Sequence, residues 1–158
     1  MAVSKQTGII KTDEISVVLG SPAPPVAGQE ASLITISGWA DGTFLNFRAL
    51  GDLTARKQGA GGEVGITLTN SSEFEVDMEI LQTSSDNALL STLVQIFLKT
   101  GIAIPFYMED ASGRTKAIGG TAVPVKWPDF GYAKEDVLNN TWTWYIAHME
   151  PFIGGNVA

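Results

Sequence analysis

The sequence contains no cysteine and a single histidine, His148, among its 158 residues. Without cysteine the chain forms neither disulfides nor thiolate metal sites, and an oxidising compartment is not indicated. The first residues lack the apolar core of a signal peptide, and no apolar run approaches the roughly 20 residues that span a bilayer. We therefore expect a soluble protein made in the cytoplasm, and the sequence indicates no metal or cofactor.

Basic residues are also scarce, because ten Lys and Arg stand against seventeen Asp and Glu and give a net charge of -7. Proteins that hold nucleic acid by its phosphates need clustered Lys and Arg, so the composition argues against such binding. It leaves open a nucleic acid that passes close by without being held. Seventeen glycines indicate many special backbone positions, and one histidine indicates little catalytic chemistry. The composition predicts an architectural protein more than an enzyme.

The pattern of apolar and turn-forming residues predicts one domain, residues 1–158, of mostly antiparallel β-structure with one helix packed on it. The Trp39-Ala40-Asp41-Gly42 turn predicts a hairpin that joins two of the strands, 32–37 and 44–48. The strands are expected at 15–19, 32–37, 44–48, 74–83, 102–108, 116–126 and 141–148.

The helix is expected at about 85–100. Ser84 or Ser85 is its N-cap, Asp86 lies in its first turn, and Gly101 ends it. Six apolar residues at helical spacing form the face expected to pack on the sheet: Leu89, Leu90, Leu93, Val94, Phe97 and Leu98.

Residues 51–72 predict an extended hairpin arm. Its tip, 55–63, has charge and glycine but nothing large to bury, and alternating Val64, Ile66 and Leu68 follow. A two-stranded arm with so little core is marginal alone. We therefore expect it to become ordered against a partner.

The strand that returns from the arm carries a row of negative charge. Side chains alternate along a strand, so one face holds Phe74, Val76, Met78 and Ile80 and the other holds Glu75, Asp77 and Glu79. Like charges side by side repel weakly, so this acidic face is expected to be specialised. It predicts a cation site, an acid pair for catalysis, or a wall that does not hold another polyanion.

A catalytic use of this face has little support from the rest of the chain. Carboxylates two residues apart on a strand lie about 7 Å from each other, within the range that glycoside hydrolases use. However, the sequence places neither a partner base nor a sugar platform, and His148 has no second histidine or Gly-x-Ser-x-Gly elbow beside it. A solvated strand face and a structural histidine are the ordinary interpretations. The Asp-containing turns lack EF-hand spacing, and Gly59 to Gly62 lacks the ending of a phosphate loop.

Four segments together resemble one family: Trp39-Ala40-Asp41-Gly42, the glycine-tipped arm, Leu81-Gln82-Thr83-Ser84-Ser85-Asp86-Asn87, and Met149-Glu150-Pro151-Phe152-Ile153-Gly154-Gly155-Asn156. The chain resembles the tail tube proteins of contractile-tailed bacteriophages over nearly its whole length. The most specific parts are 82–87 and 152–156. The Pro22-Ala23-Pro24-Pro25 insertion departs from the family pattern, so the resemblance assigns that segment no role.

The resemblance implies an antiparallel β-sandwich or small barrel with one flanking α-helix and an extended hairpin arm, similar in fold to type VI secretion tube proteins. It implies a non-enzymatic virion protein that assembles in the host cytoplasm as six-fold rings, which stack into the inner tail tube. That tube is the conduit for DNA ejection into the host bacterium. The implied partners are further copies of the chain and the sheath, baseplate, tape-measure and tail terminator proteins, with no membrane binding and no specific binding of DNA.

The resemblance also assigns roles to residues already singled out. The channel is lined by Glu75, Asp77 and Glu79, and rings stack through Arg56, Lys57, Gly59, Gly61, Gly62 and Glu63. One alternative is the tube protein of a type VI secretion system or a contractile bacteriocin. An alternative of another class is a monomeric β-sandwich binding module or a carboxylate-dependent hydrolase.

Overall fold

A computed structural model describes residues 15–20, 33–36, 39–40, 43–111 and 114–154. The helix and strands follow in the order β1 (Ile15–Gly20), β2 (Leu33–Ile36), β3 (Leu45–Ala49), β4 (Thr54–Gln58), β5 (Val64–Leu68), β6 (Phe74–Leu81), α1 (Asp86–Thr100), β7 (Ile104–Asp110), β8 (Lys116–Lys126), β9 (Asn139–Ile146) and β10 (Met149–Phe152). Within the described residues, no helix is both long and apolar enough to cross a membrane.

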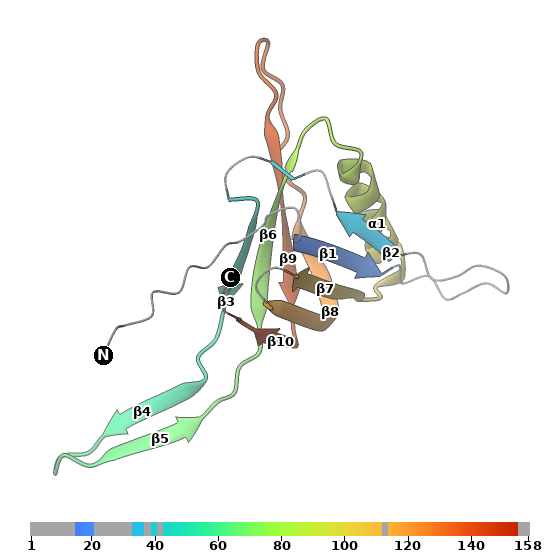
Figure 1. The fold of residues 1–158 in the computed structure, drawn as a ribbon. Coiled ribbons are helices and arrows are strands. Elements are labelled where there is room, and N and C mark those ends of the chain that lie inside the picture. Colours follow the sequence, from blue (N-terminus) through green and yellow to red (C-terminus); the bar gives the residue numbers. More distant parts are fainter. Residues whose placement is uncertain (1–14, 21–32, 37–38, 41–42, 112–113, 155–158) are drawn as a thin grey trace, which may run out of the picture.

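Eight of the strands form one antiparallel sheet with the order β2-β1-β7-β8-β9-β6-β3, and β10 pairs with β8 off this path. Figure 1 shows the sheet curving into a half-barrel with α1 on one flank, while β4 and β5 form a separate hairpin that extends away from the body. The predicted fold class, mainly antiparallel β with one flanking helix and an extended arm, is confirmed. The insertion at 22–25 lies outside the described residues.

The core lies between the inner face of the sheet and the helix. The alternation predicted for β6 is confirmed, because Val76, Met78 and Ile80 are fully buried. On β9, Trp142 and Trp144 point to the same side and lie directly opposite Met78 and Val76. Side chains of α1 complete the core, and three of them are almost fully buried: Leu90, Leu93 and Val94.

The predicted ends of the helix are confirmed in position, although the side chain of Ser85 at the N-terminal end makes no capping hydrogen bond. Gly101 adopts a left-handed conformation with φ of 67°, which glycine adopts without steric cost, and it donates its N–H to the carbonyl of Phe97 at 2.7 Å. The predicted apolar face was too wide, because Leu89 and Leu98 are 41% and 65% exposed. At 3.6 residues per turn they flank the buried stripe, and the sheet covers only its middle.

The predicted hairpin between 32–37 and 44–48 is wrong. β2 pairs with β1 and β3 pairs with β6, so the two strands stand at opposite ends of the sheet order. The segment between them crosses beside β6, since Trp39 bridges Ile80 and the Ala40 N–H donates to the Glu79 carbonyl at 3.1 Å. Asp41 and Gly42 lie outside the described residues.

The prediction of a single final strand was also wrong. After β9 the chain bends at His148, which is exposed, and returns as β10 along β8. Pro151 suits this short strand because proline is tolerated in a strand at the margin of a sheet.

Candidate functional site

The outer face of β3, β6, β9 and β8 carries polar side chains in rows that cross the strands. The register aligns Asn46, Asp77, Thr143 and Lys126 in one row. In the neighbouring row, Arg48 lies opposite Glu75. We call this surface the polar face, and Glu75, Asp77 and Glu79 lie on it together as predicted.

Arg48 neutralises much of the acidic row. Its guanidinium donates to Glu75 at 2.7 Å and also to Asp77, whose side chains are only 27% and 26% exposed. The Thr143 hydroxyl donates to Asp77 at 2.8 Å, and the Asn139 amide donates to a Glu79 oxygen at 3.1 Å. The expectation of a row of like charges that only repel one another is therefore wrong.

These contacts set the protonation of Asp77. Burial by itself raises the pKa of this carboxyl, but hydrogen bonds from Arg48 and Thr143 and the charge of Lys126 outweigh it and lower the pKa below the ordinary value of 3.8. The same pairing raises the pKa of Arg48. Asp77 is therefore an anion at neutral pH and does not suit the role of general acid, which needs a raised pKa.

An open hollow of about 510 Å³ lies over the polar face, lined by Arg48, Glu75, Asp77, Lys126, Asp129 and Asn139 among others. On the polar face, Glu75, Asp77 and Glu79 carry three negative charges. Arg48 and Lys126 carry two positive charges, so these five groups have a net charge of -1. Among the described residues, no group of three or more His, Asp or Glu side chains is placed to hold a metal ion.

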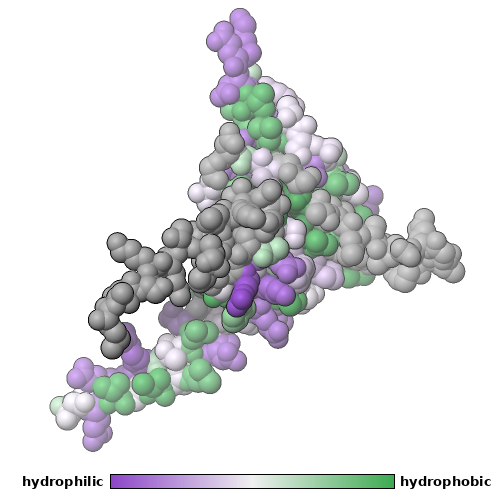
Figure 2. All heavy atoms as spheres, viewed as in Figure 1, coloured by the Kyte–Doolittle hydropathy of each residue, from purple (hydrophilic) through white to green (hydrophobic). Residues whose placement is uncertain are grey.

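The second candidate surface is the arm, the β4–β5 hairpin with its tip. All ten residues of the two strands are exposed. Residues directly opposite each other share a face, so Val64, Ile66 and Leu68 lie on the same side as Arg56. They are 60%, 70% and 74% exposed and form an apolar strip along the arm (Figure 2).

The tip of the arm is a tight turn. The Gly59 N–H donates to the Glu63 carbonyl at 2.7 Å, and the Gly62 N–H donates to the Gly59 carbonyl at 3.2 Å. Gly62 has φ of 85°, a left-handed conformation that explains why glycine stands there. Among the tip glycines Gly59, Gly61 and Gly62, only Gly62 has a positive φ.

The connection between β8 and β9, residues 127–138, is a third surface, and sequence reasoning missed it. We call it the aromatic loop, because Trp127, Phe130 and Tyr132 are 45%, 79% and 89% exposed. Gln82 anchors it: its amide donates to the Gly131 carbonyl at 2.7 Å and accepts from the N–H of residue 138 at 3.2 Å. Three aromatic residues within six positions of a loop were the signal that could have revealed it.

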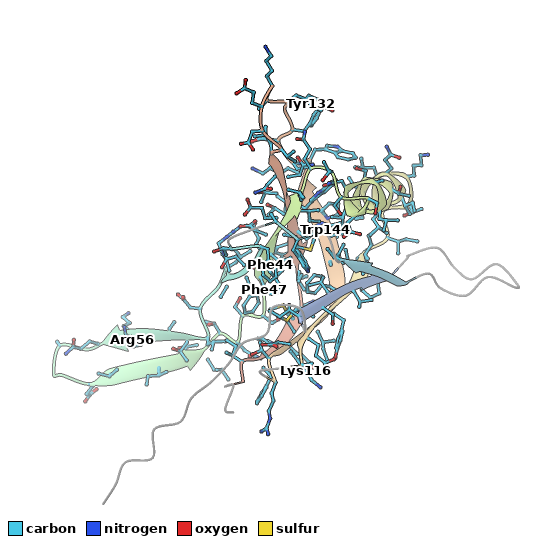
Figure 3. All side chains as sticks on the ribbon, turned by 45° about the horizontal axis from the view of Figure 1, so that its top comes forward. Phe44, Phe47, Arg56, Lys116, Tyr132 and Trp144 are labelled. Atoms are coloured by element: carbon cyan, nitrogen blue, oxygen red, sulfur yellow. The ribbon has the colours of Figure 1, made fainter. Side chains whose placement is uncertain are left out.

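The arm and the aromatic loop leave opposite ends of the sheet. β6 connects the two ends, because Phe74 pairs with Ala49 beside the arm and Leu81 pairs with Asn139 beside the loop. Seven residue steps of antiparallel strand place these ends about 24 Å apart. In Figures 1 and 3 the arm, with Arg56, and the loop, with Tyr132, extend from the body in different directions.

No protein-family model matches this chain, and no curated protein matches its sequence. Among solved structures, the chain is similar to the tube-terminating cap of the anti-feeding prophage, a structure determined by cryo-EM. The alignment covers 98% of this chain and 95% of that chain, with 12% sequence identity and a TM-score of 0.51. At this identity, the likeness shows that the two chains share a fold over nearly their whole length.

Proposed function

We propose that this chain is a non-enzymatic subunit of the tube of a contractile tail. Copies form six-fold rings, and the rings stack head to tail into a conduit for DNA ejection. The observation that carries the proposal is the arm, whose strip of Val64, Ile66 and Leu68 is exposed on a hairpin outside the core. A two-stranded hairpin is marginal alone, and a contiguous exposed apolar strip marks a surface that another molecule covers.

The two ends of the sheet suit closure of a ring. β2 and β3 stand at the two ends of the sheet order, and each has one neighbouring strand within the described residues. An unpaired strand edge is a template for pairing with another chain. In a ring, the edge of one copy meets that of the next, and the joined sheets line a channel.

The polar face suits the wall of that channel. Arg48 already donates to two carboxylates, which offset its positive charge and weaken its attraction for a phosphate. Six copies carry 42 net negative charges, six times the -7 of one chain, which disfavours adhesion of another polyanion. DNA passes such a wall without being held, because few cation contacts must be broken at each step.

A tube-terminating cap is the second candidate, favoured by the shared fold with the cap of the anti-feeding prophage. A cap ends a stack and needs a docking surface at one end. This chain presents the arm at one end and the aromatic loop at the other, which favours a repeating subunit. The tube of a type VI secretion system or a contractile bacteriocin is the alternative setting for such a subunit, and neighbouring terminase and capsid genes would favour a phage. Sheath, baseplate, tape-measure and tail terminator proteins are then its partners in the virion.

Negative-stain electron microscopy of the purified chain over a concentration series tests the proposal. Long hollow tubes support a tube subunit, single rings support a cap, and a monomer at every concentration contradicts both. A variant that lacks residues 58–62 is the matched control, because the arm lies outside the core and its removal should leave a folded protein that does not stack. A monomeric binding module or hydrolase instead predicts that Glu75→Gln abolishes binding or turnover.

A further inference from the structure

We propose that the aromatic loop of one copy is the surface that receives the arm of the next copy in the stack. The apolar strip of the arm, Val64, Ile66 and Leu68, then covers the hollow beside Trp127 and Phe130. This inference rests on the proposed function, because it names the partner surface of the arm.

The hollow beside the loop has the chemistry of an apolar contact. Its volume is about 590 Å³, and Trp127, Phe130, Tyr132 and Val137 line it together with side chains of α1. These four side chains are 45% to 89% exposed. Figure 2 shows apolar residues at the base of the loop and polar residues at its tip.

Two side-chain amides of the hollow, those of Asn87 and Gln82, are already bonded within the chain. The Asn87 carbonyl oxygen accepts from the Trp142 indole at 3.1 Å and from the Asn140 amide at 3.2 Å, while its own amide donates to backbone carbonyls. Both the nitrogen and the oxygen of the Gln82 side-chain amide form hydrogen bonds with the loop backbone. A sugar or another polar ligand would find these amides engaged, whereas an apolar side chain needs none of them.

Charge complements shape on the two surfaces. The hairpin 54–68 carries Arg56 and Lys57 against Glu63, a net charge of +1, whereas the loop carries three carboxylates against Lys134, a net charge of -2. Arg56 lies directly opposite Ile66 on the apolar side of the arm. A guanidinium beside an apolar strip matches aromatic rings beside carboxylates, because it stacks on rings and pairs with acids.

The receiving loop belongs to another copy. The arm and the loop leave ends of the sheet that are about 24 Å apart along β6 and extend in different directions, so they do not meet within one chain (Figures 1 and 3). Two unlike surfaces at opposite ends make a heterologous contact, which repeats from copy to copy.

Disulfide trapping tests the contact, since the chain contains no cysteine of its own. Ile66→Cys is placed in copies with one size tag and Phe130→Cys in copies with another, and the two are mixed, assembled under reduction and then oxidised. The matched control replaces Ile66→Cys by Thr67→Cys, the adjacent residue on the opposite side of the same strand. Because a disulfide needs Cβ atoms within about 4.5 Å, we expect at least about fivefold more linked heterodimer for Ile66 than for Thr67.

Electron microscopy of the reduced mixture separates the two proposals. Stacked rings without a preference for Ile66 over Thr67 overturn the loop contact and leave the tube proposal standing. If wild-type protein forms no rings or tubes, the tube proposal fails and this inference fails with it. If Ile66→Cys itself prevents stacking, Gln58→Cys on the same face takes its place, and its failure to cross-link in assembled tubes is equally decisive.

Discussion

Replacing Ile66 with Ser should weaken stacking while leaving the fold of each copy unchanged. Ile66 is 70% exposed on a hairpin that pairs with no strand of the main sheet in the described structure. Substitution of a surface residue outside the core changes the free energy of unfolding by less than about 0.5 kcal/mol. The thermal midpoint of the monomer should therefore stay close to that of the wild type.

The loss of stacking should be large by comparison. Full burial of an isoleucine side chain contributes about 1.5–3 kcal/mol, and seven-tenths of this side chain remains to be covered, so each copy loses about 1–2 kcal/mol. A six-fold ring multiplies this to about 6–12 kcal/mol for each pair of rings. At tenfold per 1.4 kcal/mol, two rings associate at least about 10⁴-fold more weakly.

Sedimentation of tubes over a protein concentration series, beside thermal unfolding of the monomer, measures both quantities. Thr67→Ser is the matched control, because this residue lies on the other side of the same exposed strand and should leave the assembly concentration unchanged. Tubes of Ile66→Ser at the wild-type concentration would show that the apolar strip is not buried on stacking. A fall of many degrees in the monomer midpoint would show instead that the arm supports the fold.

Three further predictions concern the body of the protein. The pKa of Asp77 is lowered in the fold, so its interactions stabilise the protein above pH 3.8 and are lost as pH falls through the folded value; acid titration of unfolding should show a shallower loss for Asp77→Asn. Trp142→Phe should reduce the free energy of unfolding by about 1 kcal/mol more than Trp144→Phe in urea titrations, because only the Trp142 indole has a hydrogen-bond partner among the described residues. Glu75→Gln should leave tube formation intact by microscopy, since a partly exposed ion pair contributes at most about 1 kcal/mol.

Local signals in the sequence predicted the parts of the fold that depend on neighbours along the chain. Strict alternation placed Val76 and Met78 inside and Glu75 and Asp77 outside, and the structure agrees. Gly101 ended the helix as predicted, because its left-handed conformation is set by one residue. The arm was found for the same reason, since turn chemistry and alternation lie within about twenty residues.

Contacts between distant residues escaped prediction. Arg48 neutralises Glu75 and Asp77 from 27 and 29 positions away, and that pairing depends on β3 lying beside β6. The predicted turn at 39–42 had instead paired β3 with the preceding segment, 32–37. Gln82 anchors the aromatic loop across 49 and 56 positions, so no local pattern marks it. Strand order is a property of the whole core, and no short window of the sequence encodes it.

The arm carries an apolar face that the described part of its own chain does not cover. Alternation of Val64, Ile66 and Leu68 describes a strand with one buried face, yet the described fold places no core against that face. Sequences that specify a fold agree at every level, and a violation that the chain retains points to function. Because the arm and the aromatic loop are unlike and lie at opposite ends, the contact that we propose between them does not close on itself. A stack built through this proposed contact would have no internal limit to its length, so another protein would have to set that length.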